Sequence, residues 1–375
     1  MKRYNGISII IPTQKSHLKY LKKLLITIKE AQNTLKNAGY SSEVIVVDSS
    51  ANEYTNKLCN GLGIRYFIGD RMLTKTRNIG IRKSAYDIIF FIDSDCYVDR
   101  NFLIEHIKIY EEKNNEKLGG VLGLTVFEGK STLGYKIMKN SSFALPFRFA
   151  TLMEYAPWGT CTNISFKKKI LETIGGFDEN WPLKHGGEDV DLGWRVNDAG
   201  YYIATNPKAV VYHTTETWSS FIKNIRRVWN WGRADYYLFK KFPNKRCLDI
   251  IKYPVLWLFI TLYQIICFLL FKKFILLGLI LLFIFMNMLM HGFLAKKQKN
   301  TSLVNEVLAE FFFNIFELGF ILEGIKNLDL SPFYQKILHT PNQLVHGWPM
   351  TAIKVWTLFI TLAAMLMAFV IGCLL

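Results

Sequence analysis

Short apolar runs alternate with amphipathic stretches over the first two thirds of the chain. The runs at residues 7–11, 44–47 and 88–92 are rich in Ile and Val and have the length of buried strands. A shorter run at 64–67 predicts another strand. Between them, apolar residues at helical spacing predict one helix from about residue 18 and a second at 74–85. This alternation predicts an α/β domain with a mostly parallel, Rossmann-like sheet.

From residue 253 onward the chain changes to long segments that carry almost no charge. The segments near 254–271, 274–295 and 353–375 are long enough, or nearly so, to cross a hydrocarbon core of roughly 30 Å. The segment 304–325 is also apolar, but it carries four glutamates, whose charges are costly inside a bilayer. It is either a further span or a helix at the interface. We therefore expect one domain at 1–243 and an α-helical membrane domain at 254–375.

The net charge of +16 comes from basic residues that crowd beside these apolar segments. Within 222–243, Arg and Lys mix with Trp and Tyr at helical spacing, which predicts an amphipathic helix at a membrane interface. The sequence contains no nucleic-acid-binding motif, so we expect anionic lipid and phosphate-bearing substrates as partners, and no nucleic acid. Six scattered cysteines show no metal-binding spacing and fit a reducing compartment.

Two segments predict how the chain is oriented in the membrane: the residues before the first strand and those after the second span. Residues 1–6 lead into the first strand without a cleavable signal, and Lys296, Lys297 and Lys299 follow the second span. The positive-inside rule places that basic loop in the cytoplasm. We therefore expect a multi-pass protein of the cell membrane whose amino-terminal domain is cytoplasmic.

Two acids close the apolar run that ends at residue 92. Asp93 and Asp95 flank Ser94 at the carboxyl end of a predicted parallel strand, where open α/β sheets bind their ligands. Two carboxylates suit a divalent cation such as Mg²⁺ or Mn²⁺, which can carry a diphosphate. A turn or helix cap is the structural alternative. The sequence has neither a G-x-G-x-x-G nor a Walker loop, so a metal is left to hold phosphates.

Five short motifs follow one another along residues 7–240. They are Pro12-Thr13, Val47-Asp48-Ser49-Ser50, Arg77-Asn78-Ile79-Gly80, Asp93-Ser94-Asp95 and Gly186-Gly187-Glu188-Asp189-Val190-Asp191-Leu192. In this order they resemble the inverting family 2 glycosyltransferases of GT-A fold. The resemblance implies a nucleotide-sugar-binding domain that transfers a sugar with the help of a divalent cation.

The resemblance also implies a role for each motif. The residues expected to contact the nucleotide sugar are Pro12, Thr13, Asp48, Arg77, Asn78 and Asp93. Asp48 would accept a hydrogen bond from the base, although Ser49-Ser50 departs from the family pattern and leaves the base open. Asp95 would be the direct metal ligand, with Asp93 reaching the ribose or, through water, the metal. Neutral His213, at the end of the apolar strand 209–212, would complete the metal site; a structural histidine is the alternative.

The acidic cluster at 188–191 would supply the base for an inverting transfer, which takes a proton from the acceptor hydroxyl. We expect Asp189 in this role, with Glu188 second, although either could cap the helix that follows. Gly186 and Gly187 allow the backbone to approach the acceptor or sugar. Asp191 is expected to pair with Arg195 one helical turn later.

Two further side chains are candidates for contacts with the sugar or acceptor. Trp158 either stacks on a sugar ring or belongs to the core. Arg227 is placed to hold the diphosphate or a lipid phosphate. Residues 224–229 around it match the Q-x-x-R-W signature of processive synthases only in part.

We therefore expect a membrane-bound, metal-dependent inverting glycosyltransferase, a hexosyltransferase by type. It would move a sugar from a nucleotide-diphosphate sugar to a lipid-linked or membrane-associated saccharide acceptor in the synthesis of cell-envelope glycans or polysaccharides. A processive polysaccharide synthase is the first alternative. The second is a non-catalytic membrane scaffold, against which the intact set of acids argues.

Overall fold

The computed structural model describes residues 4–249, 252–272 and 302–340, together with isolated helical positions between 285 and 293 and between 362 and 373. The chain divides into two compact units, the first comprising residues 1–131 and 144–219 and the second residues 132–143 and 220–375. We predicted a boundary near residue 243. The division between the compact units falls earlier, so the helix predicted at 222–243 is part of the second unit.

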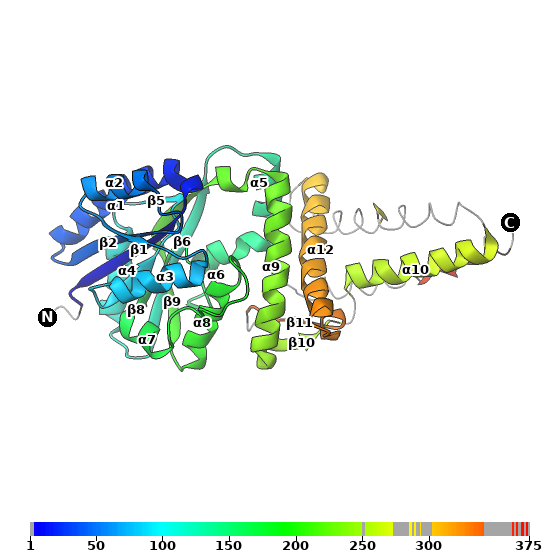
Figure 1. Cartoon of the computed structure of the whole chain (residues 1–375). Coiled ribbons are helices and arrows are strands. Elements are labelled where there is room, and N and C mark those ends of the chain that lie inside the picture. Colours follow the sequence, from blue (N-terminus) through cyan, green and yellow to red (C-terminus); the bar gives the residue numbers. More distant parts are fainter. Residues whose placement is uncertain are drawn as a thin grey trace. The chain divides into compact units, whose positions relative to one another are not determined.

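The first unit contains the elements expected from the apolar pattern, and Figure 1 labels them along the chain. Its helices and strands are β1 (Gly6–Thr13), α1 (Leu18–Asn37), β2 (Ser41–Asp48), α2 (Glu53–Gly61), β3 (Arg65–Ile68), α3 (Leu73–Lys83), β4 (Ile88–Phe91), β5 (Cys96–Val98), α4 (Phe102–Lys113), β6 (Leu118–Glu128), α6 (Phe149–Leu152), β7 (Tyr155–Ala156), β8 (Ile164–Lys167), α7 (Lys168–Thr173), α8 (Glu188–Asp198) and β9 (Tyr202–Thr214). The predicted strands and helices are thus confirmed, with boundaries shifted by a few residues.

The sheet is mixed, which corrects the prediction of a mostly parallel sheet. Its order is β3-β2-β1-β4-β8-β6-β9-β5, with β7 also paired to β9. The pairs β1–β2, β1–β4, β2–β3 and β6–β9 are parallel. The pairs β4–β8, β6–β8, β5–β9 and β7–β9 are antiparallel. The amino-terminal half is the parallel array that βαβ units produce, and β6 and β9 keep its direction. Strand β8, inserted between β4 and β6, runs the opposite way, as do the short strands β5 and β7.

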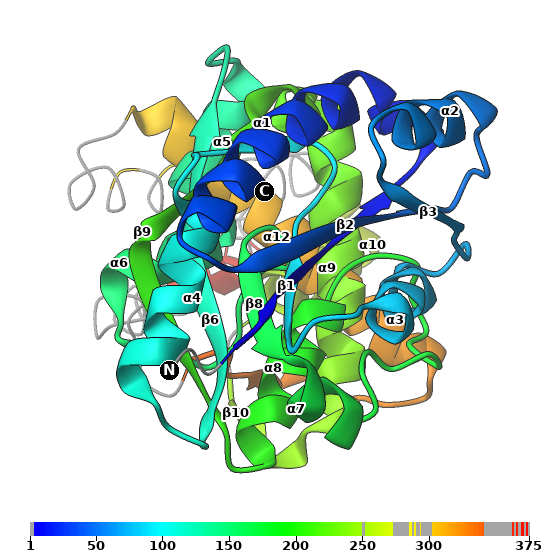
Figure 2. The ribbon, with the colours of Figure 1, turned by 90° about the vertical axis from the view of Figure 1, so that its left-hand side faces the viewer.

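Alternating side chains of the central strands fill two apolar layers. Ile9 and Phe90 belong to a core shared with α1 and α4 on one face of the sheet. Ile10 and Phe91 point to the other face, where Gly80 of α3 packs so closely that a Cβ atom there would lie 2.5 Å from Ile10. Figure 2 shows α1 and α3 on opposite sides of β1 and β2. The strands are therefore buried on both faces, and their carboxyl ends are left as the exit for polar side chains.

The second unit is mainly helical. Its described elements are α5 (Leu133–Asn140), α9 (Phe221–Lys241), β10 (Arg246–Leu248), α10 (Tyr253–Phe271), α12 (Leu303–Lys326) and β11 (Gln335–Ile337). Helices α9 and α12 pack closely along their lengths (Figure 1). A Cβ atom at Gly232 would lie 1.9 Å from the carbonyl oxygen of Phe316, and one at Gly319 would lie 2.5 Å from that of Trp229. Glycine at both positions lets the two backbones touch.

One described helix, α10, is long and apolar enough to cross a membrane. Its 19 residues would extend about 28 Å at 1.5 Å per residue, which is close to the thickness of a hydrocarbon core. Helix α12 covers the predicted segment 304–325 but is not among such helices; three of its glutamates are buried. The predicted spans 274–295 and 353–375 lie outside the described residues, apart from isolated positions.

Candidate functional site

The carboxyl end of β4 carries the first acidic residue of the site. Asp93 follows this strand, and its side chain is about one third exposed. Its Oδ1 accepts a hydrogen bond from Nη2 of Arg77 at 3.2 Å, and its Oδ2 accepts one from Oγ1 of Thr162 at 3.1 Å. Thr162 lies just before β8, which is the antiparallel neighbour of β4. The strand pairing therefore holds a partly hydrated carboxylate at the edge of the sheet.

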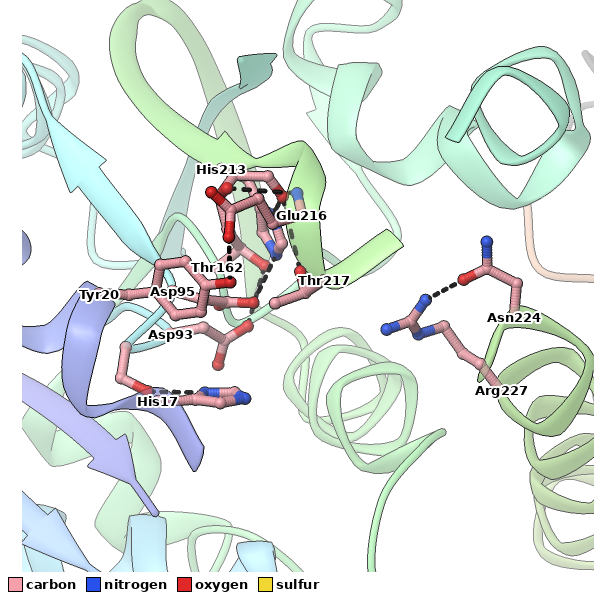
Figure 3. Close-up of polar contacts among 12 residues, drawn as sticks. His17, Tyr20, Asp93, Asp95, Thr162, His213, Glu216, Thr217, Asn224 and Arg227 are labelled. Carbon is pink, nitrogen blue, oxygen red and sulfur yellow. Dashed lines mark hydrogen bonds and ion pairs between the residues drawn. The ribbon is translucent and has the colours of Figure 1, made fainter. Parts of the chain in front are cut away.

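Asp95 and His213 are brought together by the antiparallel pairing of β5 with β9. Cys96 lies opposite His213 in this ladder, so Asp95 lies one residue beyond the pair. Nε2 of His213 is 3.5 Å from Oδ2 of Asp95. Figure 3 shows these two side chains near Asp93, on the same side of the ribbon.

The contacts of His213 leave one ring nitrogen facing the site. Nδ1 is 2.9 Å from the carbonyl oxygen of Thr214, which can only accept, so Nδ1 donates. Aromatic rings of Phe127, Phe147 and Trp218 surround the imidazole. Nε2 therefore faces Asp95 from an apolar wall.

This donor pair fits a divalent cation. A nitrogen and a carboxylate oxygen 3.5 Å apart can both bind one ion with bonds of about 2.1 Å. Burial opposes the ionisation of Asp95, but the neighbouring His213 and His17 and the hydroxyl of Thr217 hold its pKa below the usual value. Sγ of Cys96 lies within 4.8 Å of both ligand atoms, but burial raises the pKa of this thiol well above its usual value. Asp95 and His213 are thus the better ligands.

Arg77 joins the two acidic motifs. Its guanidinium donates from Nη2 to Asp93 and from Nη1 to Oε1 of Glu188, the latter at 2.9 Å. The side chain is only 4% exposed and also lies over the ring of Phe177, 5.3 Å from its centroid. We predicted that Arg77 would contact the nucleotide. Both terminal nitrogens hold carboxylates from the two motifs, and the predicted contact with the nucleotide stays a prediction.

The base motif begins helix α8. Gly186 and Gly187 have φ values of 101° and 82°, which explains why glycine is needed at both positions. Glu188 uses both oxygens, one for Arg77 and the other to accept from the backbone N–H of Gly186 at 2.7 Å. Asp189 has one oxygen engaged, by the N–H of Val190 at 2.9 Å.

The environment of Asp189 gives it the properties of a base. Burial, followed by the negative charge of Glu188, raises its pKa to about 7. A carboxylate with such a pKa holds a proton far more strongly than an ordinary aspartate, which is what general-base catalysis near neutral pH requires. Between the two acids, the geometry therefore favours Asp189, because Glu188 is fully engaged in positioning Arg77 and the glycine turn.

Two residues expected to bind the nucleotide are committed to neighbouring loops. Asp48 is fully buried and accepts from the N–H groups of Ser50 and Asn52, each at 2.9 Å, and from the hydroxyls of Ser50 and Tyr66. Asn78 donates to the carbonyl of Phe177 at 2.8 Å and to Glu179, and it accepts from the N–H of Phe177. These contacts hold both side chains in place, and their contact with a nucleotide stays a prediction.

The first strand ends in Thr13, whose side chain remains a candidate for binding the nucleotide sugar. Pro12 and Thr13 are the last residues of β1, and the carbonyl of Thr13 accepts from the backbone and hydroxyl of Ser49. The hydroxyl of Thr13 is buried and has no hydrogen-bond partner among the described residues. A buried hydroxyl without a partner at the carboxyl end of a central strand is what a ligand-binding position would leave, so this prediction stands untested.

Trp158, Arg227 and Asp191 complete the predicted set. Trp158 is 7% exposed and packs edge-on against Phe149 at 5.5 Å, so the core alternative describes it. Arg227 lies on α9 in the second unit and donates to Oδ1 of Asn224 at 2.5 Å (Figure 3). Asp191 pairs with Arg195 at 2.9 Å, as predicted from their spacing.

The sequence pattern missed three residues near the site, namely His17, Thr162 and Glu216. Nδ1 of His17, after β1, lies 3.0 Å from the hydroxyl of Ser94, and Thr162 holds Asp93. Glu216 binds Lys19 and the hydroxyl of Tyr20 and so ties the segment after His213 to α1 (Figure 3). No local periodicity marks these residues, because each acts through a contact with a distant part of the chain.

Comparison with known proteins shows what part of the chain resembles. Residues 8–175 match the family model described as glycosyl transferase family 2. The chain is 26% identical over 265 residues to the Bacillus subtilis protein named "Probable glycosyltransferase YdaM", covering 64% of this chain and 58% of that protein. It is 24% identical over 260 residues to the chondroitin synthase of Pasteurella multocida, covering 56% of this chain and 24% of that protein. The chain thus spans less than two thirds of the length of either relative.

A solved structure also resembles the chain. The mannosyltransferase PcManGT from Pyrobaculum calidifontis, in complex with GDP-Man and Mn²⁺, aligns with a TM-score of 0.48 at 15% identity, covering 98% of this chain and 87% of that one. The sequence match is the more informative of the two comparisons. The part of the chain that holds β1 to β8, with Asp93 and Asp95, matches glycosyl transferase family 2, whereas Glu188, Asp189 and His213 lie beyond the matched residues.

Proposed function

We propose that this chain is a metal-dependent inverting glycosyltransferase with a GT-A fold. It moves a sugar from a nucleotide-diphosphate sugar to a lipid-linked or membrane-associated saccharide acceptor. The match of residues 8–175 to glycosyl transferase family 2 supports the reaction class. The mixed sheet, with its acidic residues at the ends of β4 and beside β9, supports a nucleotide-sugar site at that edge.

One observation carries the proposal: Arg77 contacts acids from both motifs. Asp93, on the side of the predicted donor, and Glu188, beside the predicted base, lie within 3.2 Å of the same guanidinium. Two motifs separated by 95 positions (188 − 93) therefore form one site. A donor-binding group and an acceptor-activating group must be adjacent for direct transfer between two bound substrates.

Asp95 and His213 would hold the divalent cation, and Asp93 would reach it through water or bind the ribose. The cation would supply positive charge that offsets the charge developing on the departing nucleoside diphosphate. Asp95 contributes an ionised oxygen and His213 an unprotonated Nε2, both fixed by the pairing of β5 with β9. The two ligands are therefore already side by side before a cation binds.

Asp189 would take the proton from the acceptor hydroxyl. Glu188 holds the glycine turn and Arg77, which leaves Asp189 with an oxygen that accepts no hydrogen bond from the described side chains. Attack by the activated hydroxyl on the face opposite the leaving diphosphate would invert the anomeric centre. The neighbouring Gly187 leaves room beside this carboxylate for a sugar hydroxyl.

The membrane is proposed as the place of the reaction. Helix α10 supports this, because it can cross a bilayer by length and composition. The basic residues of α9, Arg227 among them, would face lipid or substrate phosphates. We propose a multi-pass protein of the cell membrane with the first unit in the cytoplasm.

The test is the release of nucleoside diphosphate from a panel of UDP- and GDP-sugars by the purified full-length chain, with Mn²⁺, with Mg²⁺ and with EDTA. Release from one donor, dependent on metal and absent in Asp95→Asn, is the expected result. Asp198→Asn, at the exposed end of α8, is the matched control and should behave as the parent chain. Release that survives EDTA and Asp95→Asn would refute the proposed metal site.

Calorimetric titration of the donor separates the two acidic roles. Asp95→Asn should lose metal-dependent binding, whereas Asp189→Asn should keep it and lose only turnover. Equal losses of binding in both variants would contradict the division between metal ligand and base.

Repeated addition of sugars is a second candidate, favoured by the names of two matched relatives, a chondroitin synthase and a hyaluronan synthase of Pasteurella multocida. Those relatives are matched over 24% of their length. The length of the product by mass spectrometry distinguishes the candidates: one added sugar indicates a single transfer, and a ladder indicates a polymerase.

A further inference from the structure

The end of helix α12 places an apolar side chain where folding favours glycine. The N–H of Asp329 bonds back to the carbonyl of Gly324 at 2.9 Å, and Leu328 has a φ of 56°. Glycine normally occupies the left-handed position in such a helix end, because a Cβ atom is strained there. Leu328 is also 95% exposed, so packing against the described chain does not offset this strain.

Other apolar side chains of the neighbouring segments are exposed as well, and we call Leu248, Leu328, Leu330 and Tyr334 together the leucine patch. Each of these side chains is at least 47% exposed. The antiparallel pairing of β10 with β11 places Leu248 opposite Gln335, and the N–H of Asp249 bonds to the carbonyl of Tyr334 at 2.8 Å. Residues from two distant segments are therefore held together at one end of the second unit.

The acid within this loop faces the protein. Oδ1 of Asp329 accepts the N–H of Ser331 at 2.9 Å, and its carboxylate also bonds to the side chain of Tyr236, which is buried on α9. The negative charge between Leu328 and Leu330 is thus turned away from the patch. Basic residues occur in the same segments: Lys245 just before β10, Arg246 at its start, Lys326 at the end of α12 and Lys336 on β11.

The patch also adjoins the start of the candidate membrane helix. Asp249, bonded to Tyr334, lies 3.9 Å from Nζ of Lys252, the residue before α10. The same Nζ lies 4.6 Å from the ring centroid of Phe320 on α12. Lys252 thus links the start of α10 to the segment after β10, through Asp249, and to α12, through Phe320.

We propose that the leucine patch inserts into the interfacial layer of an anionic bilayer. This rests on the membrane association in the proposed function, but not on its transferase chemistry. Exposed leucines with a tyrosine suit the boundary between headgroups and acyl chains, and a basic border suits anionic lipid. In the folded chain the side chain of Leu328 is exposed and gains no burial; in the bilayer its apolar surface would be buried.

The test attaches a bimane fluorophore at residue 328 of the full-length chain reconstituted in nanodiscs of phosphatidylcholine and phosphatidylglycerol. Cys247→Ser and Cys373→Ser remove the two thiols that are not buried, and Leu328→Cys introduces the label site. Ile68→Cys, an exposed apolar position in the first unit, is the matched control, and Leu262→Cys on α10 reports membrane insertion itself. Gel filtration and thermal unfolding check that each labelled protein is folded.

Lipids with a doxyl group should quench bimane at residues 328 and 262 but not at 68, with a blue-shifted emission at 328. Quenching at 262 without quenching at 328 would overturn the proposal while leaving membrane association intact. A blue shift at 328 without quenching would also overturn it, because protein would then cover the patch. Absence of quenching at both 328 and 262 would refute the proposed membrane association together with it.

Discussion

Asp189 is predicted to set the pH dependence of transfer. Its pKa is raised to about 7, first by burial and then by the charge of Glu188. A base must be ionised to accept a proton, so the turnover rate should rise as pH increases through this value. About one tenth of the molecules would have ionised Asp189 at pH 6 and about nine tenths at pH 8, which predicts a rise of about ninefold.

Two substitutions test the assignment. Asp189→Asn should lower kcat by about 10²- to 10⁴-fold, the usual contribution of a general base, and remove this limb of the profile. Glu188→Gln removes one cause of the raised pKa and frees Arg77 to stabilise the ionised aspartate, so the limb should move to lower pH. The control Asp198→Asn should leave both the rate and the limb unchanged.

The assay is the initial rate of nucleoside diphosphate release in the presence of acceptor, with saturating Mg²⁺, from pH 5.5 to 8.5. A flat profile, or a limb that stays at the same pH in Glu188→Gln, would refute the reasoning. Retention of the limb in Asp189→Asn would assign it to another group.

The same shift has the opposite consequence for stability. The pKa of Asp189 is higher in the folded chain than in the unfolded one, so its contribution to stability is full below about pH 4 and is lost as pH rises through about 7. Asp189→Asn has no such loss. The unfolding temperature of the variant, relative to that of the parent chain, should therefore rise between pH 5 and pH 8.

Three further outcomes follow from buried or strained positions. Burial lowers the pKa of His106 to about 4, so protonation of the unfolded chain should cost up to about 3 kcal/mol of stability as pH falls from 6.5 to 4, measurable by urea unfolding and absent in a His106→Gln variant. Gly232→Ala should lower the unfolding temperature by an amount equivalent to about 1–3 kcal/mol, because its Cβ meets the carbonyl of Phe316; Gly61→Ala, with open space, is the control, and equal effects would contradict the packing argument. Leu328→Gly should stabilise the detergent-solubilised chain by up to about 1 kcal/mol in thermal unfolding, and a loss of stability would show that this side chain supports the fold.

Local patterns in the sequence predicted the parts of the fold that depend on local physics. The apolar run before Asp93 predicted a buried strand ending in an acid, and β4 is that strand. The spacing of Asp191 and Arg195 predicted their ion pair, because residues four apart share a helix face. Glu188 and Asp189 lie together simply because they are consecutive residues at a helix start.

Contacts between distant segments could not be predicted in this way. Strand β5 has three residues and no pattern of its own, yet its pairing with β9 creates the contact between Asp95 and His213. Asn78 resembles a ligand-binding residue in sequence, but it fastens a loop 99 positions away. The antiparallel strand β8 lies between β4 and β6, and no feature of the apolar pattern indicates its direction.

The proposed metal site depends on the register between β5 and β9 as well as on which residues are present. Side chains alternate between the faces of a sheet, so a slip of one position between these strands would turn His213 away from Asp95 while preserving every ligand in the sequence. A single inserted residue in β9 could thus erase cation binding in a chain that still folds. Comparing this chain with others by its acidic motifs alone would overlook such a loss, whereas the spacing between the motifs and His213 would reveal it.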